Sequence, residues 1–434
     1  MSQSANQSVR QSATETLQTP QKPRVAVQRC AVDATDEAVY QAIRRAVDLI
    51  GGVPDAVCRA RSIVVKPNYV GVIFKKSDQE VRLSAGGRQA HNTEPAVTEA
   101  VVRLIREANP AATIVFGEGM DLPPDAPQRT AADVFRCMKA DRLVERYGVT
   151  LLDFNAGDDA DFVQVPVPGG GAIQKWLWVR REIAEADTFV SVAKLKCHQT
   201  AGVTLTTKNL FGLLPRRFYG AGNRGFMHQN AFRLMRTFVD VNTAFRQSLS
   251  ILDGLVGTTG GMNGEPLEVG CVLAGTNHLA TDAVAMTLMG FDPQADFPNA
   301  PFLISESHLK LCEAKRLGTL DLAQITQLGE APTSFGVQFE TRPEQGFSTE
   351  MAGRIIEAAR AQAGEFLRHE SDYLREYAGK YIFIVDGRVV AQTDTIAEAA
   401  TIRPTVQREH GPGIGLLAVP AAQRVERLEA YAGD

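Results

Sequence analysis

The chain has 434 residues, of which 44% are hydrophobic and 22% are charged, as in an ordinary folded protein. This composition excludes a disordered, collagen-like or disulfide-scaffold protein, and the length leaves room for two or three domains. The 46 Lys and Arg residues nearly balance the 50 Asp and Glu residues, giving a net charge of −4. We therefore expect no nucleic-acid partner.

The sequence also predicts the setting of the protein. Residues 1–23 are polar and lack the apolar core of a secretory signal, so we predict a disordered leader. No apolar run reaches the roughly 18 residues of a membrane span, so we expect no membrane contact and a cytoplasmic location. Neighbouring cysteines are at least 28 positions apart, and without a Cys-x-x-Cys pair we expect no intrinsic iron–sulfur cluster.

Short β-rich segments alternate with segments of helical periodicity along most of the chain. The expected strands are 24–28, 62–66, 113–116, 149–154, 188–193 and 250–252. The expected helices are 36–50, 94–108 with Thr93 as its N-cap, 131–147 and 203–214. This alternation predicts an α/β fold, with a mostly parallel sheet flanked by helices.

The character of the sequence changes towards its C-terminal end. Helical periodicity at 302–317 and 348–374 precedes a β-hairpin pattern at 380–392, a helix start at 395–400 and a last strand at 414–419. We therefore predict a main α/β domain at 24–328. Residues 346–434 are expected to form a helical linker and a small ββαβ module, with the boundary in 329–346.

Polar residues recur where the expected strands end. In parallel sheets ligands bind outside the carboxyl ends of the strands, so these residues are candidates for one cleft. They are Lys66, Asn68, Glu118, Lys194, Lys196 and Asp253.

The strongest local signal is a stretch without acidic residues, from Thr188 to Val239. Its 52 residues hold eight Lys or Arg residues and two histidines, which favours an anionic ligand. The alternative is a basic surface face whose charges are paired by acids elsewhere. The cations are Lys194, Lys196, Lys208, Arg216, Arg217, Arg224, Arg233 and Arg236, and the histidines are His198 and His228.

Within this stretch, strand alternation places Lys194, Lys196 and His198 on one side. Crowded ammonium groups lower the pKa of at least one lysine, which could then act as a base, and His198 could carry a proton. A solvated strand end is the alternative. The expected helix 203–214 would bring Lys208 and Asn209 to the same place.

Three further features have two interpretations each. Residues 220–225 match G-x-G-x-x-G but follow no strand, so we expect a lid carrying Arg224 and leading to His228. The glycines after Asp253 either allow a ligand close to the backbone or form a mobile loop. Asp282 either caps its own helix or assists at the site. A divalent metal held by His198, His228, Asp253 and Asp282 stays open, although their spacing is not diagnostic.

Several of these motifs together resemble one known family. Val65-Lys66-Pro67-Asn68, Gly117-Glu118-Gly119, Lys194-x-Lys196-x-His198, Lys208-Asn209-Leu210-Phe211-Gly212, His228, Asp253-Gly254 and Asp282 occur in the order of the domain of unknown function DUF362, over about residues 60–290. Many members carry a ferredoxin-like iron–sulfur segment, for which this chain lacks the clustered cysteines. Residues 380–399 resemble a small appended bacterial domain of unknown function.

The residues and the resemblance lead to one main hypothesis and one alternative. The main hypothesis is a bacterial enzyme that acts on a small anionic metabolite, a carboxylate or a phosphate, by Lys/His acid–base chemistry, with or without a metal. The alternative is a non-catalytic ligand-binding or accessory protein in iron–sulfur, redox or biosynthetic assembly, with a protein partner. The expected catalytic residues are Lys196, His198, His228 and Asp253, and the expected substrate-binding residues are Lys66, Asn68, Glu118, Lys194, Lys208, Asn209 and Arg224.

Overall fold

The computed structural model describes residues 22–70, 84, 87–120, 130–219, 231–261, 264–343, 348–385, 388–411 and 415–418. Arg224, His228 and the expected lid at 220–225 lie outside these residues, as does the leader up to residue 21.

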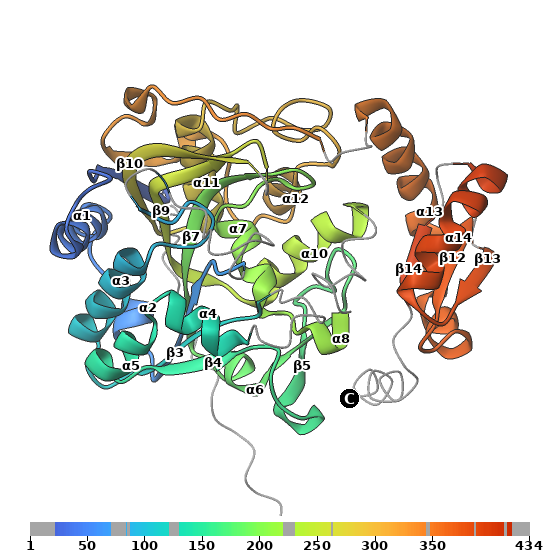
Figure 1. Cartoon of the computed structure of the whole chain (residues 1–434), viewed down its shortest axis with the longest axis horizontal. Helices are drawn as coiled ribbons and strands as arrows, with labels where there is room; N and C mark the ends of the chain where they lie inside the picture. Colours follow the sequence, from blue (N-terminus) through green and yellow to red (C-terminus); the bar gives the residue numbers. More distant parts are fainter. Residues whose placement is uncertain are drawn as a thin grey trace, which may run out of the picture.

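A nine-stranded sheet forms the centre of the main body (Figure 1). Its strand order is β11-β1-β10-β9-β7-β2-β3-β4, and β8 pairs with β7. Only β8 and β10 run antiparallel to their neighbours, which confirms the expected mostly parallel sheet. The strands are β1 (Arg24–Arg29), β2 (Ser62–Pro67), β3 (Thr113–Glu118), β4 (Thr150–Asp153), β7 (Thr188–His198), β8 (Gly202–Val203), β9 (Gln247–Thr259), β10 (Glu265–Gly275) and β11 (Thr326–Gly329). A separate hairpin pairs β5 (Phe162–Pro166) with β6 (Trp176–Arg180).

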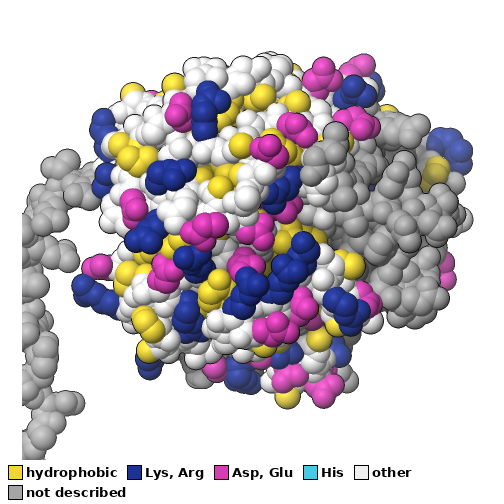
Figure 2. Space-filling view, turned by 60° about the vertical axis from the view of Figure 1, so that its left-hand side comes forward, with side chains coloured by type: hydrophobic (Ala, Val, Ile, Leu, Met, Phe, Trp, Pro, Cys, Tyr) yellow, Lys and Arg dark blue, Asp and Glu magenta, His cyan; other side chains and the backbone are white. Residues whose placement is uncertain are grey.

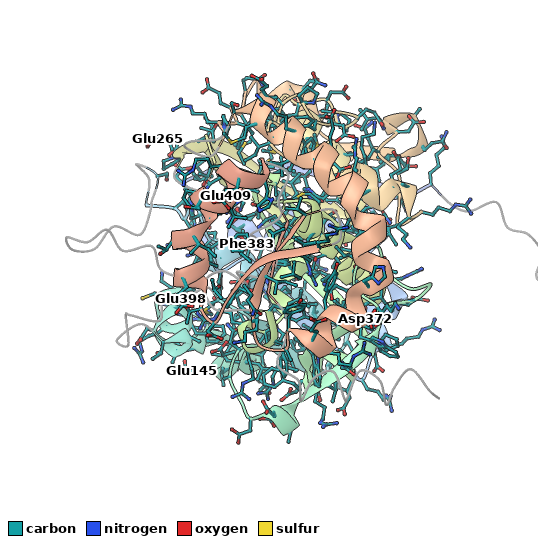
Figure 3. The ribbon with its side chains drawn as sticks, turned by 90° about the vertical axis from the view of Figure 1, so that its right-hand side faces the viewer. Glu145, Glu265, Asp372, Phe383, Glu398 and Glu409 are labelled. Carbon is teal, nitrogen blue, oxygen red and sulfur yellow. The ribbon has the colours of Figure 1, made fainter. Side chains whose placement is uncertain are left out.

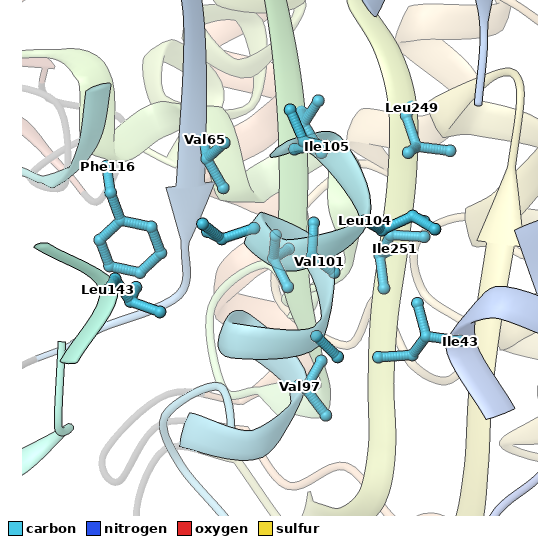
Figure 4. Close-up of a cluster of buried hydrophobic side chains, with 14 of the residues drawn as sticks. Ile43, Val65, Val97, Val101, Leu104, Ile105, Phe116, Leu143, Leu249 and Ile251 are labelled. Carbon is cyan, nitrogen blue, oxygen red and sulfur yellow. The ribbon is translucent and has the colours of Figure 1, made fainter. Parts of the chain in front are cut away.

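Helices cover both faces of the sheet because alternate strand residues are apolar on each side. Val190 and Val192 of β7 pack in the cluster beneath α1 and α3, whereas Ala193 and Leu195 pack in the cluster beneath α11. Figure 4 shows the first cluster, in which the apolar side chains of α3 pack against those of the strands. The helices of the main body are α1 (Asp36–Leu49), α2 (Asp55–Cys58), α3 (Pro95–Ala108), α4 (Ala131–Cys137), α5 (Asp141–Tyr147), α6 (Arg181–Ala184), α7 (Thr206–Asn209), α8 (Arg216–Tyr219), α10 (Ala231–Ala244), α11 (His278–Leu288) and α12 (His308–Ala314).

Several element bounds differ from those that the sequence predicts. Strands β7 and β9 continue five and seven residues beyond their expected ends, at residues 193 and 252, because the polar residues there are buried and hydrogen-bonded. The expected helix 131–147 is broken into α4 and α5, with Lys139 in a left-handed conformation between them (φ 55°). The expected helix 203–214 shortens to α7 and a 3₁₀ turn, and 302–317 shortens to α12.

The C-terminal region has the expected ββαβ order. Strands β12 (Tyr381–Val385), β13 (Arg388–Thr393) and β14 (Gly415–Ala418) form an antiparallel sheet in the order β13-β12-β14. Because side chains alternate along β12, Ile382 and Ile384 pack with Tyr373 of α13 (Thr349–Glu376), and Phe383 packs with α14 (Ile396–His410). Figure 3 shows Phe383 on this small sheet, which the two helices flank.

The segment expected to separate two domains packs partly on the main sheet. Its first residue, Gly329, ends strand β11, which is parallel to β1. Phe339 is buried in the apolar cluster beneath α11, and the Gly260 amide donates to the Glu340 carbonyl over 2.7 Å. Residues 329–340 thus belong physically with the main body.

The visible surface carries charges of both signs, and the helices are those of a protein without a membrane span among its described residues. On the face seen in Figure 2, Lys and Arg side chains are interspersed with Asp and Glu side chains. Within the described residues, no helix combines the length and the apolar character that crossing a bilayer requires.

Candidate functional site: a buried lysine cluster

Three lysines meet at the carboxyl ends of two neighbouring parallel strands. Lys66 is the penultimate residue of β2, and Lys194 and Lys196 are among the last five residues of β7. The exposed fractions of these three lysines are 1%, 0% and 1%. We call these three residues the lysine cluster. A lysine ammonium is rarely this buried unless its charge is compensated, so its partners decide what each residue can do. This burial excludes the alternative of a solvated strand end.

The first lysine of the cluster has a carboxylate partner. The Lys66 ammonium forms a short ion pair with Glu118 at the end of β3, and also donates to the Pro67 carbonyl over 2.8 Å. The same carboxylate accepts from the Tyr69 amide at 3.0 Å and the Gly119 amide at 2.9 Å. A Cβ on Gly212 would lie 2.2 Å from the Glu118 carboxylate, so only glycine fits against this pair.

The second lysine is also neutralised by a carboxylate. The Lys194 ammonium lies 2.7 Å from Asp253 Oδ2, and both side chains are fully buried. Asp253 also accepts from the Glu94 amide at 2.8 Å and the Leu255 amide at 3.0 Å. This pair therefore ties β7 and β9 to the start of α3.

The third lysine contacts neutral oxygens instead. The Lys196 amine donates to Asn68 Oδ1 over 2.7 Å and to the His91 carbonyl over 2.9 Å. Asn68 is oriented by Asn209, whose Oδ1 accepts from Asn68 Nδ2 at 3.0 Å. Asn209 in turn donates to the Lys66 carbonyl at 3.0 Å and to Ser191 Oγ at 2.9 Å.

The surroundings of Lys196 favour a neutral amine. Burial lowers its pKa well below the usual value, and the positive charges of Lys208, Lys194 and Lys66 lower it further, against an opposing effect of Glu118. Lys208 is the largest electrostatic cause. Its own side chain is partly exposed, and its ammonium lies 5.7 Å from the centre of the Phe238 ring.

His198, at the end of β7, is buried and held in one orientation. Its Nδ1 accepts from the Thr200 and Ala201 amides, each over 3.1 Å. Because Nδ1 is an acceptor, the neutral ring carries its proton on Nε2. His198 is thus arranged as a proton donor through Nε2.

Asp282 caps a helix, but a different one from the helix in which it lies. Its carboxylate accepts from the Thr206 amide and hydroxyl at 2.8 and 2.6 Å, and from the Thr207 amide at 2.8 Å. It thereby fixes the start of α7, which carries Lys208 and Asn209. The expectation that it caps α11 is wrong, because Asn277 does so. Burial raises the pKa of Asp282 to about 6.

Two of the glycines after Asp253, Gly254 and Gly257, lie within β9 and serve packing in the sheet. Gly260, Gly261 and Gly264 follow the end of β9 and lie between it and β10. A Cβ on Gly257 would lie 2.8 Å from the Leu195 carbonyl, and one on Gly254 would lie 2.5 Å from Cys271 Sγ. At these two positions the close approach is therefore to neighbouring strands.

Acids pair some of the cations in the stretch without acidic residues, as the second interpretation of that stretch expects. Lys194 pairs with Asp253, Arg217 with Asp159 at 2.9 Å and Arg236 with Glu306 at 2.7 Å. Among the described residues, no three His, Cys, Asp or Glu side chains gather as a metal site, and His228 lies outside that set.

A polar cavity of about 340 Å³ lies beside the start of α3 and contains none of the predicted site residues. Acidic and basic side chains both line it, among them Asp33, Arg88, Glu94, Lys139 and Arg142.

Sequence reasoning missed the segment that completes the cluster. His91 supplies a carbonyl to Lys196, and Thr93 does not cap α3 but accepts from the Asn68 amide at 2.9 Å and donates to the Val192 carbonyl at 2.8 Å. In the sequence, this segment is marked by the run of four polar residues His91-Asn92-Thr93-Glu94. The structure buries all four. Ser191, within the apolar part of β7, gave no such signal.

The fold and the site together define an α/β protein with a mostly parallel sheet and buried lysines at its carboxyl edge. The chain belongs to the family described as Domain of unknown function (DUF362), whose model matches residues 63–287. Residues 372–401 match a second model, Family of unknown function (DUF5678). Both matches confirm the resemblances drawn from the motifs.

Two individual proteins are similar to this chain. The thylakoid-associated protein sll1697 of Synechocystis is 25% identical over 268 residues, which cover 59% of this chain and 71% of that protein. The lactate racemase apoprotein from Thermoanaerobacterium thermosaccharolyticum aligns with a TM-score of 0.35 and 13% identity, over 62% of this chain. The alignment spans 57% of the racemase chain.

Proposed function

We propose that the protein is an enzyme that binds a small anionic metabolite, a carboxylate or a phosphate, at the lysine cluster and moves a proton on it. The observation that supports this most is the different pairing of three equally buried lysines. Lys66 and Lys194 are neutralised by carboxylates, whereas Lys196 contacts two neutral oxygens. Such a perturbed, buried lysine is typical of functional sites.

The proposed roles follow from these contacts. Lys208, partly exposed and electrostatically close to Lys196, would attract the anion. Lys196, as a neutral amine, would take a proton from the ligand. The ammonium so formed would lie beside the anion produced, which favours the transfer. His198, with its proton on Nε2, would return a proton.

The paired residues would act indirectly in this proposal. Lys194 and Asp253 hold each other, so we assign them to positioning of β7 and α3 instead of to anion contact or catalysis. Asn68 and Asn209 would orient Lys196. Arg224 and His228, which lie outside the described residues, stay predicted participants.

The test is a calorimetric titration of the protein with inorganic phosphate, malonate and pyruvate. An anion that has no proton to give up should raise the pKa of Lys196, which then draws from the buffer the proton that a reacting metabolite would supply. Up to one proton should thus be taken up, measured by repeating the titration in buffers of different ionisation enthalpy. Lys208→Met should weaken binding roughly ten- to a hundredfold, the value of a hydrogen bond to a charged group.

Two variants complete this test. Lys196→Met should abolish the proton uptake, and exposed Lys175→Met should change neither quantity. If none of the three anions binds, or if Lys208→Met and Lys196→Met titrate like the unaltered protein, the anion site is wrong. Binding without any turnover of bound metabolites would instead support the accessory-protein alternative.

A further inference from the structure

We propose that Lys196 forms a Schiff base with the carbonyl carbon of a small 2-oxo acid. This inference rests on the proposed anion site and narrows its ligand from anions in general to anions that carry a carbonyl group.

The hydrogen bonds of Lys196 suit a neutral, nucleophilic amine. A neutral amine has two N–H donors and one lone pair, and the structure gives Lys196 two acceptors, Asn68 Oδ1 at 2.7 Å and the His91 carbonyl at 2.9 Å. With both donors engaged, the lone pair is left for an electrophile. The two acceptors also fix the direction of the amine, since Asn68 is itself held by Asn209.

The other two lysines of the cluster lack this arrangement. The nitrogen of Lys194 is 2.7 Å from the Asp253 carboxylate, and that of Lys66 is paired with Glu118, so in each case the neighbouring charge stabilises an ammonium, which is not nucleophilic. Buried lysines surrounded by further cations are known to react as free amines. Lys196 is the member of the cluster with such surroundings.

The positive surroundings also select the electrophile. A Schiff base forms when the amine adds to the carbonyl carbon and the resulting carbinolamine loses water, which needs no oxidant or reductant. The protonated imine is a cation and would be disfavoured beside Lys194 and Lys208. A 2-oxo acid brings a carboxylate with its carbonyl group, and that negative charge offsets the new cation, which a simple neutral aldehyde cannot do.

Access to Lys196 is expected from the side of Lys208. Lys208 is partly exposed, as are Gln199 and Thr200 directly after β7, so the carboxyl end of this strand reaches the surface. A carboxylate bound at Lys208 would lie near Lys196, because the Lys208 charge lowers the pKa of Lys196 more than the charge of any other side chain does.

The experiment treats the full chain with glyoxylate and sodium cyanoborohydride, which reduces an imine to a stable carboxymethyl-lysine that peptide mapping locates. At pH 7 only about one in two thousand ordinary lysines is neutral. Lys196 should therefore be modified at least about tenfold faster than exposed Lys175. Between pH 7 and pH 9 its rate should change less than about twofold, whereas that of Lys175 should rise about a hundredfold.

Peptide mapping of the unaltered protein identifies the modified residue without any variant. Lys196→Met and Lys196→Arg should lose the adduct, whereas the control Lys175→Met should keep it at Lys196. Modification spread over exposed lysines, with Lys196 unmodified or rising with pH like them, would overturn the inference. A parallel titration with malonate, which has two carboxylates but no reactive carbonyl, separates the two proposals. If malonate binds and no adduct forms at Lys196, the anion site stands and the Schiff base falls.

Discussion

The three lysines of the cluster differ in the groups that compensate their burial, since Lys66 and Lys194 meet carboxylates and Lys196 meets neutral oxygens. The amine of Lys194 meets a carboxylate that two backbone amides also hold, so the pair is a fixed structural unit. Burying two charges costs desolvation energy, and the attraction between them offsets this cost only while both partners are present. The pair therefore acts as a constraint on the site.

The first prediction concerns this pair. Asp253→Ala should lower the free energy of unfolding by about 3–5 kcal/mol, because Lys194 would keep its burial and lose its carboxylate. The double variant Lys194→Met/Asp253→Leu should recover part of this loss, since an apolar pair leaves no buried charge but the Glu94 and Leu255 amides lose their acceptor. Urea unfolding measures both.

An exposed pair supplies the control for this experiment. Arg59 and Asp55 lie 2.9 Å apart with 80% of each side chain exposed, so Asp55→Ala should leave the free energy of unfolding nearly unchanged. If Asp253→Ala behaves like Asp55→Ala, the buried pair does not hold the site together.

At the scale of elements, the short helix α7 depends on a carboxylate from a distant helix. Four residues are too few for a stable helix in isolation. Asp282 of α11 binds the first two residues of α7, Thr206 and Thr207, and so holds Lys208 near the lysine cluster. The position of Lys208 is thereby set by α11.

The second prediction follows from the pKa of this carboxyl. Burial raises the pKa of Asp282 from 3.8 to about 6, so the folded protein binds its proton more tightly than the unfolded chain. The resulting stabilisation is complete below pH 3.8 and is lost as the pH rises to about 6. It amounts to about 3 kcal/mol, at 1.36 kcal/mol for each pKa unit.

Asp282→Asn cannot titrate and provides the comparison. The free energy of unfolding of the unaltered protein, minus that of the variant, should fall by about 2 kcal/mol between pH 4 and pH 6.5 in urea titrations. A difference that stays constant or grows with pH would show that burial does not dominate the titration of Asp282. The comparison cancels the other carboxyl groups, which are common to both proteins.

The elements of this fold could be predicted where local patterns determine them. Alternating strands and helices gave the parallel sheet, and the hairpin pattern gave the C-terminal ββαβ order. The ends of β7 and β9 could not be predicted, because a lysine in a strand reads as a surface residue until its partner is known. Those partners are 59 residues away for Lys194 and 128 residues away for Lys196.

From the sequence it could be predicted which residues gather at the ends of the strands, but not which of them form pairs. The carboxyl-end rule brought Lys66, Glu118, Lys196 and Asn68 into one set, and the structure joins them. Which lysine has a carboxylate and which has a neutral oxygen depends on tertiary geometry alone. The Lys196 acceptor at His91 is a backbone carbonyl, so its side-chain type carried no information about the contact.

At the scale of the whole molecule, the state of Lys196 is a product of the complete fold. Strand β2 brings Asn68, the segment before α3 brings His91, and α7 brings Lys208, all to the end of β7. Unfolding separates these groups and returns the amine to water. Folding therefore lowers the pKa of this one lysine, chiefly by burying its amine and then by placing Lys208 and Lys194 near it.

The most direct test is a pH titration of the protein labelled with ¹³C at the lysine ε-carbons, followed by NMR, with Lys196→Met to assign the resonance. The resonance of Lys196 should already have the chemical shift of a neutral amine at pH 8. The resonance of exposed Lys175 serves as the reference in the same titration. If the Lys196 resonance instead titrates together with that of Lys175, the amine is an ordinary ammonium, and both the proposed proton transfer and the Schiff base lose their basis.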